Sequence, residues 1–413
     1  MTEPMFSSGV WPDNRQGEQG KMTSKTPSAV SSAKTQVAAK RFTRRTVLKA
    51  SVGAGAAGLV FRGIVKDAFS SSGSVNIMMW SDYLPPDFVA GFESSTGIKI
   101  NFTGIGSNDE ILNKLKATRG RGFDLVTPTN NRSLQYVDTG LLQPLDMKKI
   151  PNIGNVNPAM LKVGETEWNF GAKGSHWLPH LWGTEAIAWR TDKWKPEGGV
   201  PSYGAVWDKA NAGMTMGRPH SMMLGAGLYM ETAGELAPGS VWAAYESEDK
   251  MRPIWEKITA WCIARKPQIK ILWNDADTQK NGLLNEGIVV GQTWDGPVLA
   301  LKTAGEPVTY QAPKEGALAW VDGLSIPTGA ENFDQLYAFL EYTFRPEPAG
   351  KAIDTHGYNS AVLGADKFAG PAYAKNFAEA YPGDALAKLL PWPKEPVWYA
   401  DIRTEYANKF QSA

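Results

Sequence analysis

The stretch WSDYLPPDFVAGFESSTGIKINF, residues 80–102, contains the signals of a strand end, a helix and a second strand in succession. It follows the apolar run VNIMM at residues 75–79, which predicts a buried strand. The two prolines predict a helix start, Phe88 and Phe92 lie one turn apart, and Gly97 predicts the helix end. The run IKINF predicts the next strand. We therefore expect aromatic and acidic residues at the end of the first strand, where open α/β sheets bind ligands.

Short apolar strands and amphipathic helices continue to alternate along the chain, which is typical of α/β layers. The sequence SNDE at 107–110 predicts a capping box at the start of a helix. A third strand is predicted over 123–129 and a short helix over 133–139. Farther along, WVDGLSIP at 320–327 predicts a strand and FDQLYAFLEYTF at 333–344 a helix. No linker separates two units, so we expect two lobes that share crossing strands.

The composition narrows the possible functions. The 413 residues include 43 basic and 42 acidic side chains, so the net charge of +1 gives no overall field that would attract nucleic acid. The chain has 4 His and 1 Cys, which excludes an intrachain disulfide and argues against a zinc or iron–sulfur site. We expect no metal and no cofactor.

The N-terminal residues 1–73 carry the signals of a targeting segment. A polar stretch that predicts disorder precedes TRRTVLKASVGAGAAGLVF at 43–61. The Arg44–Arg45 pair followed by a weakly apolar run resembles a twin-arginine export signal, and the run is too short to span a bilayer. We therefore expect export to the periplasm and a mature protein of about 340 residues.

Eight stretches between residues 75 and 361 resemble, in order, the periplasmic spermidine- and putrescine-binding proteins of ABC importers. They are WSDYLPPDFVAGFESSTGIKI, SNDEILNKLKA, FDLVTPT, GLLQPLD, LPHLWGTEAIAW, GEPVTYQAPKEGALAWVDGLSIP, FLEYTFRPE and HGYNS. The resemblance implies the two-lobe periplasmic binding protein fold of type II, with a ligand cleft between lobes that close like a hinge.

The same resemblance implies the division of the chain and its role. Residues 74–183 and 321–360 would form lobe 1, and residues 184–320 and 361–413 would form lobe 2. The chain would capture a polyamine or a related amine-bearing solute and deliver it to the permease subunits of the importer. It would act as a monomer and would not be an enzyme.

The family's ligand-binding positions carry over to seven residues of this sequence. They are Trp80, Tyr83, Thr129, Trp294, Trp320, Asp322 and Tyr358. Asp82, between the first two at the strand end, is a further candidate from the residues themselves. The aromatic members stand where the family surrounds an alkylammonium group and its methylene chain. Asp322 stands at the carboxylate that binds the ammonium, and Thr129 replaces a serine that hydrogen-bonds an amine. Ring faces attract such a cation by roughly 0.5–2 kcal/mol each.

The sequence departs from the family at the far end of the predicted site. Asn131 replaces an aromatic residue, and Arg218 and Ser221 stand where acidic residues bind the second ammonium group. Glu185 and Asp295 are the acids that could replace them. Alternatively, Arg218 pairs with a carboxylate, and the ligand is then amino-acid-like, for instance an ω-amino acid.

Two further alternatives remain from the residues. The same fold could bind an anion or a sugar, with Arg218 as the anchor. A secreted carbohydrate-active enzyme would fit the 16 Trp and neighbouring acids such as Asp275 and Asp277, but no sequence motif nominates a catalytic pair. We predict no catalytic residues.

Overall fold

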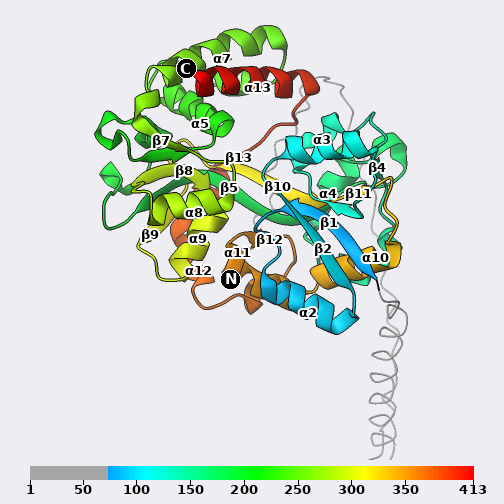
Figure 1. Ribbon diagram of the computed structural model, residues 1–413. Coiled ribbons are helices and arrows are strands. Elements are labelled where there is room, and N and C mark those ends of the chain that lie inside the picture. Colours follow the sequence, from blue (N-terminus) through cyan, green and yellow to red (C-terminus); the bar gives the residue numbers. More distant parts are fainter. Residues whose placement is uncertain (1–72) are drawn as a thin grey trace, which may run out of the picture.

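The computed structural model describes residues 73–413 as a mixed α/β structure (Figure 1). Its strands are β1 (Ser74–Trp80), β2 (Lys99–Ile105), β3 (Leu125–Val126), β4 (Leu142–Gln143), β5 (Leu178–Arg190), β6 (Thr215–Gly217), β7 (Ile269–Leu272), β8 (Val290–Trp294), β9 (Val308–Gln311), β10 (Leu318–Leu324), β11 (Ile326–Pro327), β12 (Asn359–Ser360) and β13 (Leu390–Pro391). Its α-helices are α2 (Pro86–Thr96), α3 (Asn108–Thr118), α4 (Pro158–Glu167), α5 (Pro219–Thr232), α6 (Ser240–Ala243), α7 (Glu248–Ile263), α8 (Ala276–Leu284), α9 (Asp295–Thr303), α10 (Phe333–Thr343), α11 (Pro346–His356), α12 (Tyr373–Ala380) and α13 (Val397–Ser412). The predicted export signal lies outside the described residues.

The strands form two main sheets. The smaller sheet has the order β2-β1-β3 with all strands parallel. The larger sheet has the order β13-β10-β5-β8-β6-β7, with β9 and β12 also paired to β5. We call β1–β4, β11, α2–α4 and α10 the first lobe, and β6–β9, β13, α5–α9, α12 and α13 the second lobe. Figure 1 shows these two groups on opposite sides of the long strands β5 and β10.

The strand–helix–strand unit predicted over residues 75–102 is confirmed. Parallel strands are covered on both faces, and β1 accordingly buries most of its side chains. Phe88 and Phe92 form the buried side of α2, and Gly97 ends the helix with φ 76°. That left-handed conformation favours glycine, because a Cβ atom would be strained there.

Helix α3 begins with a capping arrangement close to the predicted one. The Ser107 hydroxyl accepts a hydrogen bond from the Glu110 backbone N–H (3.1 Å). The Glu110 carboxylate accepts one from the N–H of Gly106 (3.1 Å), one residue earlier than in a standard capping box. These bonds fix the N-terminus of α3 directly after β2, beside the end of β1.

Two predictions for the first lobe are wrong in extent. The third strand pairs only over Leu125–Val126. Asp124 before it uses its side chain to accept hydrogen bonds from other backbone groups, and Pro128 after it has no N–H to offer. The helix expected at 133–139 is instead a 3₁₀ helix over Asn130–Gln135, whose polar side chains make tertiary hydrogen bonds.

Strands β5 and β10 run antiparallel and connect the lobes. At its C-terminal end β10 meets the first lobe, where Thr129 bridges to Asp322. The register between β5 and β10 shifts by one residue after Asp322, which leaves His180 of β5 as the extra residue of a β-bulge. The strand and helix predicted at 320–327 and 333–344 are confirmed as β10, β11 and α10.

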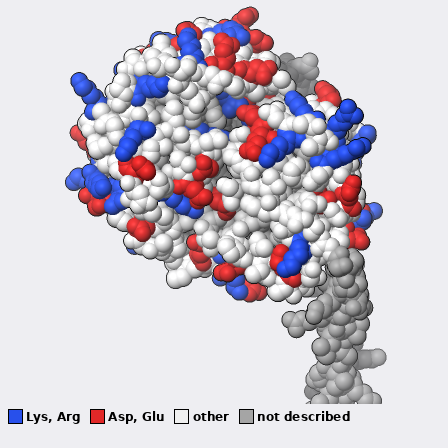
Figure 2. All heavy atoms as spheres, in the orientation of Figure 1, with Lys and Arg blue, Asp and Glu red and all other residues white. Residues whose placement is uncertain are grey.

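The second lobe has a hydrophobic core beneath α5, α7 and α13. Trp255 of α7 stacks on Tyr406 of α13 with ring centroids 6.2 Å apart, and Phe410 is fully buried beside them. Among the described helices, none is both long and apolar enough to cross a membrane. Figure 2 shows acidic and basic side chains interspersed over the visible face, in keeping with the balanced charge.

Candidate functional site

A cavity that is open to solvent lies between the lobes, and the space inside it together with the solvent at its mouth amounts to about 660 Å³. Segments from both lobes line it, including the end of β1, the N-termini of α3 and α5, the end of β8 and the middle of β10. The cavity brings together eleven of the thirteen predicted site residues. They are Trp80, Asp82, Tyr83, Thr129, Asn131, Glu185, Arg218, Trp294, Trp320, Asp322 and Tyr358.

Four rings form one end of the cavity, and we call them the aromatic cage: Trp80, Tyr83, Trp320 and Tyr358. Tyr358 lies between two of the others, with its ring centroid 5.2 Å from that of Tyr83 and 5.4 Å from that of Trp320. The Trp80 and Tyr83 centroids are 6.4 Å apart. Trp80 is fixed by its indole N–H, which donates to the Thr127 carbonyl (3.2 Å). The cage therefore presents ring surface whose orientation is set by the strand ends.

The Asp322 carboxylate lies at the cage and is only half satisfied. Its Oδ2 accepts a hydrogen bond from the Tyr83 hydroxyl, and the Thr129 side chain interacts with the carboxylate and favours its ionised form. Its Oδ1 is buried and receives no hydrogen bond of ordinary geometry from a described residue. Burial raises the pKa of Asp322 to about 7. An unsatisfied buried acceptor costs roughly 1–3 kcal/mol, so this oxygen is poised for a donor that enters the cavity.

Asp82 adds a second acidic group beside the cage. Its Oδ2 is likewise buried without a hydrogen-bond partner among the described residues. Burial raises the pKa of Asp82 to about 6. The Trp320 indole N–H is also unpaired, so residues that line the cavity hold both unpaired acceptors and an unpaired donor.

Thr129 and Asn131 lie where the first lobe meets β10. The Thr129 hydroxyl accepts a hydrogen bond from Asn108 (2.7 Å), and its N–H donates to the same side chain (2.9 Å). This exchange ties the N-terminus of α3 to the wall beside Asp322. The Asn131 carbonyl accepts from the Glu395 N–H (2.8 Å), which brings the C-terminal segment to the cavity.

Arg218 lies at the start of α5 with its guanidinium 5.3 Å from the Trp294 ring centroid and 5.9 Å from that of Trp273. It donates a hydrogen bond to the Gly106 carbonyl (3.1 Å) across the lobes. Glu185 is buried nearby on β5 and accepts a hydrogen bond from Gln292 (2.9 Å). Burial raises the pKa of Glu185 and lowers that of Arg218 to about 10.

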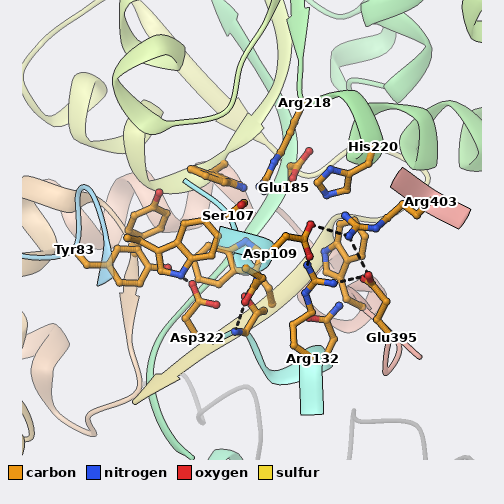
Figure 3. Close-up of a pocket in the computed structure, with 18 of the residues that line it drawn as sticks. Tyr83, Ser107, Asp109, Arg132, Glu185, Arg218, His220, Asp322, Glu395 and Arg403 are labelled. Carbon is orange, nitrogen blue, oxygen red and sulfur yellow. Dashed lines mark hydrogen bonds and ion pairs between the residues drawn. The ribbon is translucent and has the colours of Figure 1, made fainter. Parts of the chain in front are cut away.

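Four side chains at the other side of the cavity form a network that we call the charge cluster: Asp109, Arg132, Glu395 and Arg403. Arg132 binds the carboxylates of both Asp109 (2.7 Å) and Glu395. Arg403 binds the same two groups, at 3.3 Å and 3.1 Å. Figure 3 shows this cluster to the right of Asp322 and Tyr83. Each arginine is thus neutralised by shared acids.

Two predicted site residues do not line the cavity. Ser221 is buried in the first turn of α5, where its hydroxyl donates to the Arg218 carbonyl (3.4 Å). Asp295 begins α9 and accepts hydrogen bonds from the Tyr381 hydroxyl (2.9 Å) and the Gly296 N–H (3.0 Å). Its carboxylate therefore binds groups behind the cavity wall and is not a replacement for the missing acid patch. Asp275, considered for an enzyme, caps α8 through the Thr278 N–H (2.7 Å).

Eight further residues line the cavity and were not predicted. They are Ser107, Asn108, Asp109, Arg132, His220, Trp392, Glu395 and Arg403. The first three had one usable signal, because they follow β2, the strand next to β1, and neighbouring parallel strands end at the same sheet edge. The C-terminal members carried no local signal. No group of three or more potential metal ligands was found among the described residues.

Comparisons with known proteins show that the chain is similar to bacterial solute-binding proteins. The sequence profile described as bacterial extracellular solute-binding protein matches residues 87–379. The spermidine/putrescine-binding periplasmic protein of Escherichia coli is 26% identical over 364 residues, covering 86% of this chain and 97% of that protein. A putrescine-binding periplasmic protein of the same organism is 28% identical over 349 residues, with 82% and 91% covered.

A solved structure shows the same fold. The spermidine/putrescine ABC transporter substrate-binding protein of Streptococcus pneumoniae superposes with a TM-score of 0.61 at 22% identity, over 83% of this chain and 99% of that one. The predicted two-lobe fold of type II periplasmic binding proteins is therefore confirmed, as is the resemblance to this group of transport proteins.

Proposed function

The chain belongs to the family of bacterial extracellular solute-binding proteins, and on this premise we propose that it captures an amine-bearing small solute, such as a polyamine, for an ABC importer. It would deliver the solute to the permease subunits of that importer and act as a monomer without catalysis. The similar proteins named above bind spermidine or putrescine according to their names.

One observation carries the proposal: the unpaired Oδ1 of Asp322 lies within the aromatic cage. An alkylammonium group leaving water needs a carboxylate or ring faces to replace its hydration. The cage supplies both at one place, and the ring surface of Trp80 continues toward Trp294, at a centroid distance of 5.7 Å. The methylene groups of a solute would lie along these rings.

The way the cavity is built supports capture by lobe closure. Asp322 lies on β10, close to the first lobe, whereas Trp294 and Arg218 come from the second. Rotation about β5 and β10 would separate these walls and admit a solute. We propose the lobe boundaries inferred from the sequence, 74–183 with 321–360 and 184–320 with 361–413.

We also propose that the protein works in the periplasm after export by the twin-arginine route. Several similar proteins are named as periplasmic. The paired arginines and the short apolar run at residues 43–61 support this route. Fractionation of cells lacking the twin-arginine translocase tests it, since a precursor retained in the cytoplasm is expected.

Titration of the mature protein with spermidine and putrescine tests the proposed ligand class. We expect saturable quenching of tryptophan fluorescence and an increase in melting temperature, because ligand at 100 times its dissociation constant adds about 2.7 kcal/mol. The variant Asp322→Asn should lose this response. Asp366→Asn, at an exposed position outside the cavity, is the control and should retain it. A wild-type protein that responds to sugars or plain anions but to no amine would refute the proposal.

A further inference from the structure

Arg218 provides a second polar group at the cavity, apart from the aromatic cage. Figure 3 shows Arg218 and Asp322 on opposite sides of the cavity, reaching in from the N-terminus of α5 and from β10. Building on the proposed function, we infer that Arg218 binds a carboxylate of the solute, so that the captured amine is a zwitterion with its charges at opposite ends.

The guanidinium of Arg218 contacts no carboxylate, although Glu185 and Asp109 attract its charge from beyond ion-pair distance. Arg218 is 9% exposed, and the one hydrogen bond that its guanidinium makes to a described residue goes to a neutral carbonyl, that of Gly106 (3.1 Å). Its other close neighbours are the faces of Trp273 and Trp294. No carboxylate of the described residues lies within ion-pair distance of it. A buried guanidinium with five donors and no carboxylate in contact with it is a ready site for an anion.

The other two arginines that line the cavity are each paired with carboxylates, unlike Arg218. Arg132 and Arg403 each contact both Asp109 and Glu395. These acids are therefore occupied by protein cations and do not offer a free carboxylate to a second ammonium group of a diamine. Within this one cavity, two arginines therefore form ion pairs with protein carboxylates and Arg218 does not.

Glu185 is the remaining acid near Arg218, and it does not neutralise the guanidinium by contact. Its Oε1 accepts a hydrogen bond from the neutral Gln292 side chain (2.9 Å). Burial raises the pKa of Glu185, which favours its uncharged form. A second ammonium group placed here would lie against Arg218 and would be repelled.

The surroundings of Arg218 also suit a carboxylate. Arg218 and His220 begin α5, a helix of 14 residues whose N-terminal end favours negative charge. Burial and the neighbouring arginines lower the pKa of His220, so a neutral ring is available to donate one hydrogen bond. The rings of Trp80 and Trp294 lie between the two ends, which fits a methylene chain and therefore an ω-amino acid better than an α-amino acid.

A matched ligand series tests the inference by isothermal titration calorimetry. The series contains ω-amino acids with three, four and five methylene groups, each compared with the α,ω-diamine of the same length. We expect at least one ω-amino acid to bind about tenfold or more tighter than its diamine. In Arg218→Met this preference should disappear or reverse. Arg121→Met, which removes an exposed arginine that does not line the cavity, should keep it.

The outcomes separate this inference from the proposed function. Diamines that bind as tightly as the ω-amino acids overturn the carboxylate site and leave the amine-binding role intact. Failure of both series to bind the wild-type protein overturns both. Should Arg218→Met not fold, Arg218→Lys serves, since it keeps the charge but loses the planar fork; weaker ω-amino acid binding with unchanged alkylamine binding supports the inference, and unchanged binding of both counts against it.

Discussion

The Asp322 carboxylate lowers the stability of the ligand-free protein and offers a hydrogen-bond acceptor to a bound solute. This carboxylate is buried, lacks one hydrogen-bond partner and has its pKa raised to about 7 by desolvation. In the unfolded chain an aspartate ionises near pH 4. Between these two values the native state holds a proton that the unfolded state has lost, so Asp322 lowers the stability of the empty protein as the pH rises from about 4 to about 7.

Replacing this charge should therefore stabilise the empty protein at high pH. We expect Asp322→Asn to raise the free energy of unfolding by roughly 2–4 kcal/mol at pH 8 and by little at pH 4. Chemical denaturation at the two pH values measures this. Asp124→Asn gives the opposite sign, because Asp124 accepts hydrogen bonds from the N–H groups of Asn76, Glu331 and Asn332, and its pKa is lowered. Equal destabilisation by both substitutions would contradict the account of Asp322.

Amine binding should depend on pH through the same groups. The pKa values of Asp82 and Asp322 are raised to about 6 and about 7, so both carboxyls are largely protonated at pH 5. An ammonium group favours the ionised forms, and its binding near pH 6 should release protons. We expect affinity to fall as the pH decreases from 8 to 5. Calorimetry in two buffers with different ionisation enthalpies detects the released protons, and binding that is independent of pH and buffer would rule this mechanism out.

At the scale of elements, the turn after α11 decides where Tyr358 of the cage lies. Gly357 ends that helix with φ 79°, and a Cβ atom there would lie 2.0 Å from the Gly296 carbonyl oxygen. The residue thus needs both a left-handed backbone and contact with the start of α9. Gly364 offers a comparison, since it has φ 78° but nothing within 4 Å of its Cβ position.

The substitution Gly357→Ala should separate these two effects. We expect Gly364→Ala to cost about 1 kcal/mol from backbone strain alone, and Gly357→Ala to cost at least about 2 kcal/mol. Only Gly357→Ala should also weaken solute binding, because the displaced turn moves Tyr358. Thermal denaturation and ligand titration of both variants provide the test. Unchanged affinity in Gly357→Ala would show that the cage tolerates this shift.

Elements with strong local signals could be predicted from the sequence, and those that depend on distant contacts could not. The burial of Phe88 and Phe92 follows from their spacing, and the α3 cap from Ser107 and Glu110. The 3₁₀ helix at Asn130–Gln135 depends on tertiary bonds made by its side chains, which no short window contains. For that reason a regular helix was expected there.

The residues of the candidate site also differ in whether a local sequence signal or only distant contacts could reveal them. The aromatic cage and Asp322 were accessible through a resemblance whose motifs are contiguous. The charge cluster was missed because Arg132 and Glu395 are 263 positions apart in the sequence. The sequence does not reveal that Asp295 binds elsewhere, because the Tyr381 hydroxyl that donates to its carboxylate is 86 positions away.

For the whole molecule, the charge cluster joins the lobes. Asp109 and Arg132 belong to the first lobe, whereas Glu395 and Arg403 lie in the C-terminal segment that packs on the second. Two of the ion pairs, Arg132–Glu395 and Arg403–Asp109, cross between the lobes and can form only when the lobes approach. We therefore expect these two pairs to stabilise the closed arrangement.

Removing one shared acid should shift the balance toward open lobes. Glu395→Gln leaves two buried arginines with a single carboxylate, and we expect a loss of about 3–5 kcal/mol in stability. The radius of gyration of the ligand-free protein, measured by small-angle X-ray scattering, should increase. Glu256→Gln removes an exposed ion pair with Lys409 and should cost less than about 1 kcal/mol without changing the radius. A compact Glu395→Gln protein would show that closure does not depend on the cluster.

The bulge at His180 restricts changes in the length of β5. On one side of it β5 alternates its side chains in phase with β10, and on the other side the phase is reversed. Insertions are tolerable in the surface loops, yet a single residue added to or deleted from this strand would turn one lobe's interior residues toward water. Related sequences can therefore change the residues that contact the solute. The length of β5 is much harder to change, because it fixes which side chains of each lobe face the interior.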